Sequence, residues 1–246
     1  MKLTKKLMPL AIMSTMSVPA MMAAAPAQAE ITGNLSVVSK YVFRGGFVLE
    51  DFTVHENNNT AMQGGLDYAH ESGFYAGYWG SNLDYGDDAI GFENDFYIGF
   101  GGDAGAVSYD IGLVQYLYLS IDDADVFEIY GSVGLGPVSL GLSYLGDDVV
   151  WGNQGDIYWS LGYEAELPDD FSFSATLGFY TYETDGEFIP DTDDSEDSGF
   201  KHLDLTLSHP LADTGADMSI TYMVGGDDRF GESIEDTVIL GLSMGF

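Results

Sequence analysis

The stretch that decides the fold is IYGSVGLGPVSLGLSYLG, residues Ile129–Gly146, an uncharged run almost as long as a membrane-spanning helix. It does not predict a helix, because five glycines and Pro137 interrupt it. Apolar residues instead recur at every second position on both sides of Gly134-Leu135-Gly136-Pro137, which is the period of a β-strand. The stretch therefore predicts two strands joined by a tight turn.

The same two-residue period continues in both directions from this hairpin. Between Ile31 and Phe246 it predicts about twelve strands of roughly ten residues, each with one apolar face and one face of polar or small residues. Alternation alone fits two architectures. In a soluble β-sandwich the apolar faces point inward, whereas in a membrane β-barrel they point outward.

The connections between the predicted strands favour the barrel. One set is short and rich in Gly, Pro and Asp, as turns require, and comprises residues 71–73, 101–105, 134–137, 167–170 and 210–215. The alternate set is mostly long and acidic, and comprises residues 44–59, 81–89, 120–125, 146–155, 183–199 and 225–236. This segregation is typical of outer-membrane barrels. We therefore expect an all-β, antiparallel transmembrane β-barrel of about twelve strands, with short periplasmic turns and long acidic extracellular loops.

Composition excludes several classes of function. The chain has 246 residues and carries 40 Asp and Glu against 7 Lys and Arg, a net charge of -33, which excludes a nucleic-acid binder that neutralises phosphates. An apolar content of 46%, with 16 Tyr and 15 Phe, is too high for a disordered acidic chain. The absence of Cys excludes a disulfide scaffold, a thiolate metal site and a Cys nucleophile.

Residues 1–29 are predicted to be a cleavable signal peptide. Three lysines among the first six residues precede an uncharged run, Leu7–Ala25, and Ala27-Gln28-Ala29 fits a signal-peptidase site. An uncleaved membrane anchor is the alternative, but prolines and serines interrupt the run. We expect a mature barrel of residues 30–246.

Aromatic residues near the strand ends support a membrane barrel. The chain stops on Phe246 after an alternating strand, as outer-membrane barrels commonly do. Interfacial aromatic girdles are expected from five residues, with ordinary β-propensity as the alternative explanation: Tyr41, Phe43, Trp159, Phe171 and Phe179.

Alternation also assigns charged residues to the barrel interior. Charge beside lipid is costly, so these residues imply water or paired partners inside the barrel. Lys40 and Arg44 have two interpretations: internal salt bridges in a plugged barrel, or the cationic side of a constriction. The expected pore-lining residues are Lys40, Arg44, Asp67, Glu93, Asp95, Asp110, Glu128 and Asp204, with Asp156, Glu164, His202 and Asp217 on the same inward faces.

The sequence offers little for catalysis. His202, Asp204 and Ser208 share one strand face, so a membrane-embedded hydrolase is conceivable, but no Gly-x-Ser-x-Gly elbow is present and a solvated histidine is the simpler interpretation. Residues 191–197 resemble a calcium loop but have Glu196 where the sharp turn requires Gly. We expect no enzyme activity, no cofactor and no metal site.

Two motifs near the N-terminus carry a family resemblance. Residues 39–46 read SKYVFRGG, and the hairpin after the first loop reads QGGLDY at 63–68 and GFYAGYWGSN at 73–82. Over residues 36–82 the chain resembles the TorF-family porins, also described as the Gcw_chp family of bacterial proteins of unknown function. The remainder is similar in strand rhythm and in the terminal Phe. The resemblance implies an outer-membrane barrel and a pore.

These inferences predict an outer-membrane porin of a Gram-negative bacterium that lets small solutes diffuse passively. Twelve strands lie between the eight that side chains fill and the 16 to 18 that leave an aqueous channel, so the pore should be narrow. Its acidity favours cations or neutral solutes. A non-conducting surface barrel that binds partners through acidic loops is the alternative. Expected partners are outer-membrane lipid and lipopolysaccharide, the barrel assembly machinery and small polar solutes, and not nucleic acid.

Overall fold

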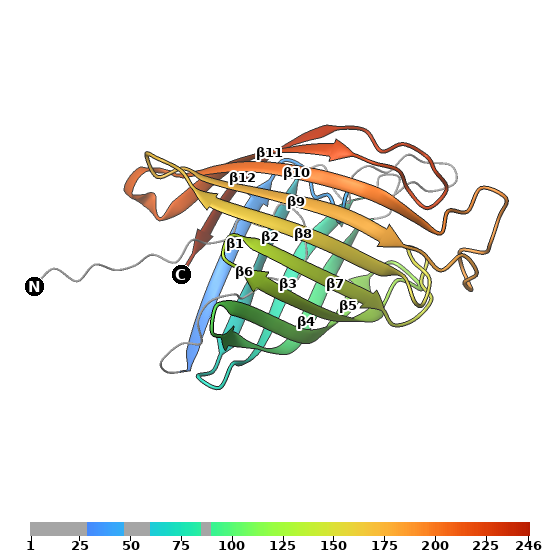
Figure 1. The fold of residues 1–246 in the computed structure, drawn as a ribbon, viewed down its shortest axis with the longest axis horizontal. Helices are drawn as coiled ribbons and strands as arrows, with labels where there is room; N and C mark the ends of the chain where they lie inside the picture. The colour runs from blue at the N-terminus through green and yellow to red at the C-terminus, as the bar shows by residue number, and fades with distance from the viewer. Residues whose placement is uncertain (1–28, 47–59, 85–89) are drawn as a thin grey trace, which may run out of the picture.

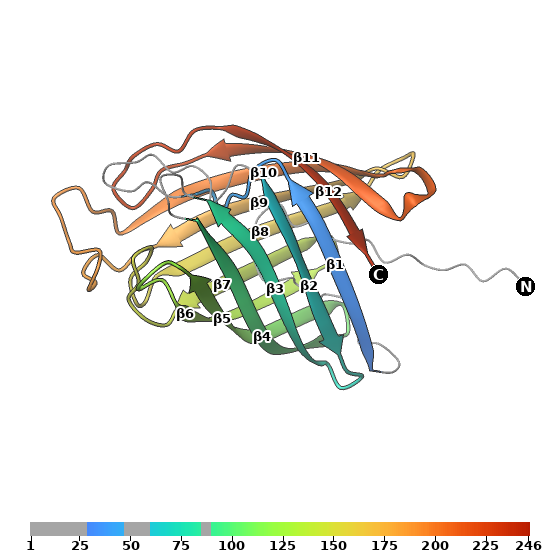
Figure 2. The ribbon, with the colours of Figure 1, turned by 180° about the vertical axis from the view of Figure 1, so that it is seen from behind.

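The protein is a closed antiparallel β-barrel, seen from opposite sides in Figures 1 and 2. A computed structural model describes residues 29–46, 60–84 and 90–246. Each strand pairs with its neighbours in sequence, and β1 pairs with β12 to close the ring. The predicted signal peptide lies almost wholly outside the described residues, so its cleavage stays a prediction.

The described residues form twelve strands and one short 3₁₀ turn, η1, and no helix among them is long and apolar enough to cross a membrane. The sequence prediction of an all-β barrel of about twelve strands is confirmed. The strands are β1 Glu30–Val38, β2 Ala61–Ala69, β3 Phe74–Asp84, β4 Ile90–Ala104, β5 Val107–Leu119, β6 Val126–Leu135, β7 Val138–Leu145, β8 Ile157–Glu166, β9 Ser172–Thr181, β10 Ser198–Pro210, β11 Ala216–Gly225 and β12 Thr237–Gly245, with η1 at Ala212–Thr214.

The hairpin predicted from residues 129–146 forms β6 and β7. Its strands pair up to Leu135 and Val138, which leaves only Gly136 and Pro137 in the turn. Gly136 has φ +59°, a left-handed conformation that glycine adopts without steric cost. The turn is two residues shorter than the sequence predicts, because Gly134 and Leu135 continue the strand.

Alternation separates the strand faces into an outer and an inner set. The apolar side chains Leu140, Leu142 and Leu240 are exposed on the outside, whereas Ser143 and Ile239, each on the opposite face of its strand, are buried inside. The barrel thus presents a broad apolar outer surface, and polar and aromatic side chains fill its interior.

Tyrosines on the inner face lie over glycines of neighbouring strands. Tyr75 of β3 is paired in register with Gly99 of β4, and Tyr130 of β6 with Gly112 of β5. A Cβ on Gly99 would stand 2.2 Å from the Tyr75 hydroxyl, and one on Gly112 would stand 2.3 Å from the Tyr130 ring. The inward glycines therefore make room for aromatic rings inside a narrow barrel.

The connections lie at the two ends of the barrel. At the end that holds the C-terminus they span at most five residues, whereas the opposite end carries the longer segments 146–156, 182–197 and 226–236 (Figure 1). One predicted turn, residues 101–105, is wrong in extent: β4 continues through Gly101–Ala104 and pairs with Val107–Asp110. Residues 47–59 and 85–89, which belong to two predicted loops, lie outside the described residues.

The first strand ends earlier than its alternation predicts. β1 stops at Val38, and the chain then enters the barrel, where Tyr41, Val42 and Phe43 are buried. The prediction that Tyr41 and Phe43 belong to an outer aromatic girdle is therefore wrong. Alternation assigns a face only while the chain remains in the sheet, and here the backbone leaves it. Phe171 and Phe179 are exposed on the outside, and Trp159 is half-buried.

Deleting Phe246 should destabilise the barrel, because this residue exchanges two backbone hydrogen bonds with Gly33 of β1 (2.8 and 2.9 Å) where the ring closes. We expect the free energy of unfolding to fall by about 1–3 kcal/mol, measured by urea denaturation of the refolded protein. Deleting the exposed Asp194 is the control. Equal effects from the two deletions would contradict this role for the terminal residue.

Candidate functional site in the barrel interior

Of the eight residues predicted to line a pore, seven are buried inside the barrel. Lys40 is half-buried, whereas the other seven are almost inaccessible to solvent. Their role in lining a pore stays a prediction. The seven buried residues are Arg44, Asp67, Glu93, Asp95, Asp110, Glu128 and Asp204.

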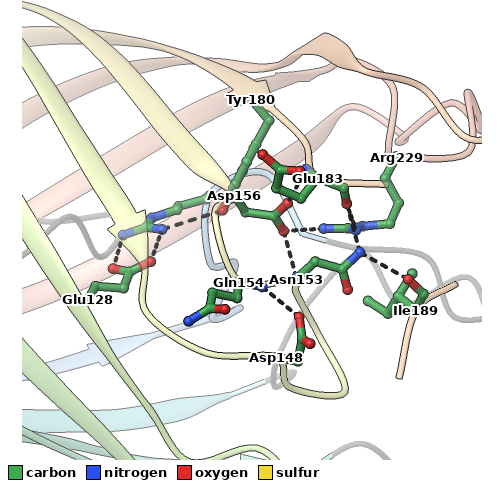
Figure 3. Close-up of polar contacts among 10 residues, drawn as sticks. Glu128, Asp148, Asn153, Gln154, Asp156, Tyr180, Glu183, Ile189 and Arg229 are labelled. Carbon is green, nitrogen blue, oxygen red and sulfur yellow. Dashed lines mark hydrogen bonds and ion pairs between the residues drawn. The ribbon is translucent and has the colours of Figure 1, made fainter. Parts of the chain in front are cut away.

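The centre of the site is an ion pair between Arg44 and Glu128. Nη1 and Nη2 of Arg44 donate to the two carboxylate oxygens of Glu128, both at 2.7 Å (Figure 3). Each of these residues is only 1% exposed. Tyr116 donates a further hydrogen bond to Glu128 at 2.9 Å, and Arg44 Nη1 lies 3.4 Å from the hydroxyl of Tyr180. A parallel two-bond geometry of this kind is the strongest arrangement that arginine and a carboxylate adopt.

Aromatic rings complete the surroundings of the guanidinium group. Its Cζ lies 4.6 Å from the ring centres of both Phe43 and Tyr158. Phe43 belongs to the same inward segment, whereas Tyr158 comes from β8. The site therefore holds a planar cation by charge and by contact with ring faces.

Two further carboxylates lie in this region of the interior. Glu93 accepts hydrogen bonds from Tyr41 at 2.7 Å and from Tyr118 at 3.0 Å. Asp95 is 2% exposed, and neither of its carboxylate oxygens has a hydrogen-bond partner among the described residues. Asp95 shares its strand face with Glu93 and is paired in register with Tyr116, which donates to Glu128, so three carboxylates lie in the same region as the guanidinium of Arg44.

Tyrosine hydroxyls donate hydrogen bonds to two other inward carboxylates, Asp110 and Asp67. Tyr75 donates to Asp110 at 2.8 Å and shares a 2.6 Å hydrogen bond with Tyr130, and Tyr97 donates to Asp67. These donors are neutral, so they hydrogen-bond the carboxylates without cancelling their charge, and Oδ2 of Asp110 is left without a partner among the described residues. The interior accordingly keeps an excess of acid.

The structure does not assemble the Ser–His–Asp arrangement that the sequence raised as an alternative. His202 Nε2 lies 2.9 Å from the Tyr158 hydroxyl, and Nδ1 lies 3.1 Å from a carboxylate oxygen of Asp204. Within the part of the chain that the structure describes, only Nε2 is hydrogen-bonded, and its partner is Tyr158. His202 and Ser208 are six residues apart on β10, about 20 Å along the strand, so the imidazole cannot activate the Ser208 hydroxyl. Nor do the described residues hold a group of three or more His, Asp and Glu suited to a metal ion.

Sequence reasoning missed a second arginine cluster beyond the strand ends. Arg229 is ion-paired with Asp156, which also accepts backbone N–H bonds from Asn153 at 3.0 Å and Glu183 at 2.9 Å (Figure 3). Burial raises the pKa of the Asp156 carboxyl, and the charge of Arg229 acts against this rise. The cluster joins three long connections, residues 146–156, 182–197 and 226–236, so it fixes this end of the barrel.

Two other residues predicted to face the interior are not fully enclosed. Glu164 is exposed near the end of β8, so it is not enclosed, and Asp217 is half-buried. Lys201 is buried in β10 although alternation did not assign it to the interior. The register between β9 and β10 shifts between Phe200 and His202. This irregularity interrupts the alternation of faces, so counting every second residue placed Lys201 on the wrong face.

Arg44 and Glu128 should be strongly coupled in stability. Arg44→Met or Glu128→Leu alone leaves a buried charge without its partner, so each should lower the free energy of unfolding by about 3–5 kcal/mol. The double variant should lose much less than the sum, because both charges are then absent. Urea unfolding of all four proteins measures the coupling, and additive losses would show that the pair does not act as a unit.

Several solved structures have a similar fold. The KdgM porin matches with a TM-score of 0.53 and 8% identity over 87% of this chain and 99% of that chain. The NanC porin matches with a TM-score of 0.51 and 10% identity over 87% and 99%. An outer membrane channel from Pseudomonas putida F1 matches with a TM-score of 0.53 and 10% identity over 92% and 98%. At such low identity these similarities establish the barrel fold alone.

Sequence comparison identifies the family. No curated protein matches the sequence significantly. The narrower resemblance to the TorF-family porins stays a prediction. A family model described as a bacterial protein of unknown function (Gcw_chp) matches residues 22–246, and the chain therefore belongs to the Gcw_chp family.

Proposed function

We propose that the protein is a narrow outer-membrane channel of the porin type, through which small cationic or neutral polar solutes diffuse. The observation that carries this proposal is the inversion of the strand faces: apolar residues cover the outside of a closed barrel, while carboxylates and tyrosines fill its inside. A soluble protein has no reason to expose so large an apolar surface. The porin-like fold is consistent with this proposal.

The proposed membrane orientation follows from the connections. The short turns, at the end that holds the C-terminus, face the periplasm, and the long acidic connections face outward. Acidic residues of these connections, such as Asp193 and Asp194, then lie near lipopolysaccharide. Divalent cations bridge their carboxylates to its anionic groups. Export through the predicted signal peptide and insertion by the barrel assembly machinery complete this proposal.

We infer that passage is closed at the level of Arg44 in the described conformation. Because Arg44 and Glu128 are almost fully buried, water does not reach the ion pair, and the inward segment 39–46 occupies this part of the barrel. Conduction therefore requires this segment to move. Solutes that pass would meet Glu93, Asp95 and Glu128, whose excess negative charge in a low-dielectric wall favours cations.

An arginine on the outer face should be tolerated far less than one on the inner face. Leu240, in the middle of β12, is 55% exposed on the apolar outside, whereas Thr237 shares the inward face of the buried Ile239. We expect Leu240→Arg to lower stability in lipid vesicles by about 2–4 kcal/mol and Thr237→Arg to have a small effect. The opposite order would show that lipid does not cover the outer face.

Planar-bilayer recordings test the channel and its selectivity together. We expect a small conductance with a cation-selective reversal potential in a salt gradient. The variant Glu93→Gln/Asp95→Asn should shift that potential toward anions. The matched variant Asp193→Asn/Asp194→Asn alters exposed loop charges, which salt screens over about 8 Å at ~0.15 M, so it should have little effect.

An anion-selective wild type, or equal shifts from the two variants, would overturn the proposed selectivity. A filled interior also fits a second candidate function, a non-conducting surface barrel that binds partners through its acidic connections. Absence of conductance, together with cell or matrix binding that disappears when residues 183–199 are deleted, would favour that function.

A further inference from the structure

We propose that the barrel interior contains a binding site for guanidinium cations, and that Arg44 occupies this site as a ligand supplied by the chain itself. This proposal names a class of solute for the proposed channel. Transport of that solute rests on the proposed function, whereas binding does not. Binding at the site can be measured whether or not the barrel conducts.

The site belongs to the barrel wall, whereas Arg44 does not. Glu128 comes from β6, Tyr116 from β5, Tyr158 from β8 and Tyr180 from β9, so four strands build it. Arg44 reaches it on the connection that follows β1, after the backbone has left the sheet. Its guanidinium group therefore stands in the position of a bound solute.

The geometry selects a guanidinium group over a simple ammonium group. Glu128 accepts two parallel N–H bonds of 2.7 Å, which only a planar fork of donors makes. Tyr158 presents its ring face 4.6 Å from the central carbon, and Tyr180 offers its hydroxyl oxygen to the same nitrogen that faces Glu128. An ammonium ion is a point charge and fills only part of this arrangement.

The neighbouring carboxylates define the solute further. Asp95 is buried, and both of its oxygens lack a hydrogen-bond partner among the described residues. Glu93 lies two residues away on the same face of β4, and Glu128 accepts a hydrogen bond from Tyr116, the residue paired with Asp95. A solute that also carried a carboxylate would be repelled here, whereas a second amine would be attracted. The expected class is therefore small alkylguanidinium compounds without an acidic group.

Arg44 and a free solute compete for one site. A tethered group has an effective concentration in the millimolar range, so a solute must reach similar levels or bind more tightly to displace it. Removing the Arg44 side chain abolishes this competition and leaves Glu128 without its partner. The vacated site should then accept the missing group from solution.

The test uses the refolded full-length mature protein with Arg44→Ala and measures its thermal unfolding in detergent by circular dichroism. Methylguanidinium chloride is compared with methylammonium chloride and sodium chloride at equal millimolar concentration. At about tenfold its Kd, methylguanidinium should raise the midpoint by about 3–5 °C, and the other two salts should have less than half that effect. The wild type should respond weakly, because Arg44 already fills the site.

The double variant Arg44→Ala/Glu128→Gln is the matched control and should lose the selective response. If Arg44→Ala does not refold by itself, each of the three salts is added during refolding. Recovery of folded protein with methylguanidinium, but not with the other two salts, would support the site. Equal responses to the three salts, a response retained without the Glu128 charge, or recovery with none of the salts would overturn it. If methylguanidinium alone stabilises Arg44→Ala and the protein shows no conductance, the guanidinium site is supported and the channel function is contradicted.

Discussion

Closure of the antiparallel hydrogen-bonded ring between β1 and β12 is the constraint from which the other features of the barrel follow. Once the ring is closed, each strand has one face outside and one face confined to a narrow interior. Alternation places apolar side chains outside and carboxylates such as Asp95 and Glu128 inside. An enclosed charge without water requires hydrogen bonds or an opposite charge, so closure determines which groups must meet in the interior.

The chain supplies these partners in two ways. Tyrosine hydroxyls from β3, β5 and the segment that follows β1 donate to Glu93 and Asp110, and inward glycines such as Gly99 leave space for the Tyr75 ring. Arg44 is brought in from outside the sheet, and its ion pair with Glu128 fixes the segment 39–46 against the opposite wall. Asp95 is left without a hydrogen-bond partner among the described residues, and together with Glu93 and Glu128 it gives the excess of acid from which the cation preference is expected.

Most of the barrel could be predicted from the sequence because its strand faces follow a strict period. The hairpin at residues 129–146, the strand number and the inward position of Glu93, Asp95 and Glu128 all depend only on alternation. Alternation cannot show where a chain leaves the sheet, so it misplaced Tyr41 and Phe43. It also cannot identify hydrogen-bond donors, since a tyrosine such as Tyr116 has the same β-propensity whether its hydroxyl binds a carboxylate or faces solvent.

The segment carrying Arg44 lies inside the barrel, and cysteine accessibility tests this position most directly because the chain contains no Cys. Val42 is 0% exposed, whereas Asp194 lies on the surface. Val42→Cys and Asp194→Cys would be treated in the folded state with a bulky hydrophilic maleimide. We predict rapid labelling of Asp194→Cys, and labelling of Val42→Cys only after unfolding in denaturant. Equal labelling rates in the folded barrel would contradict the inward position of the segment.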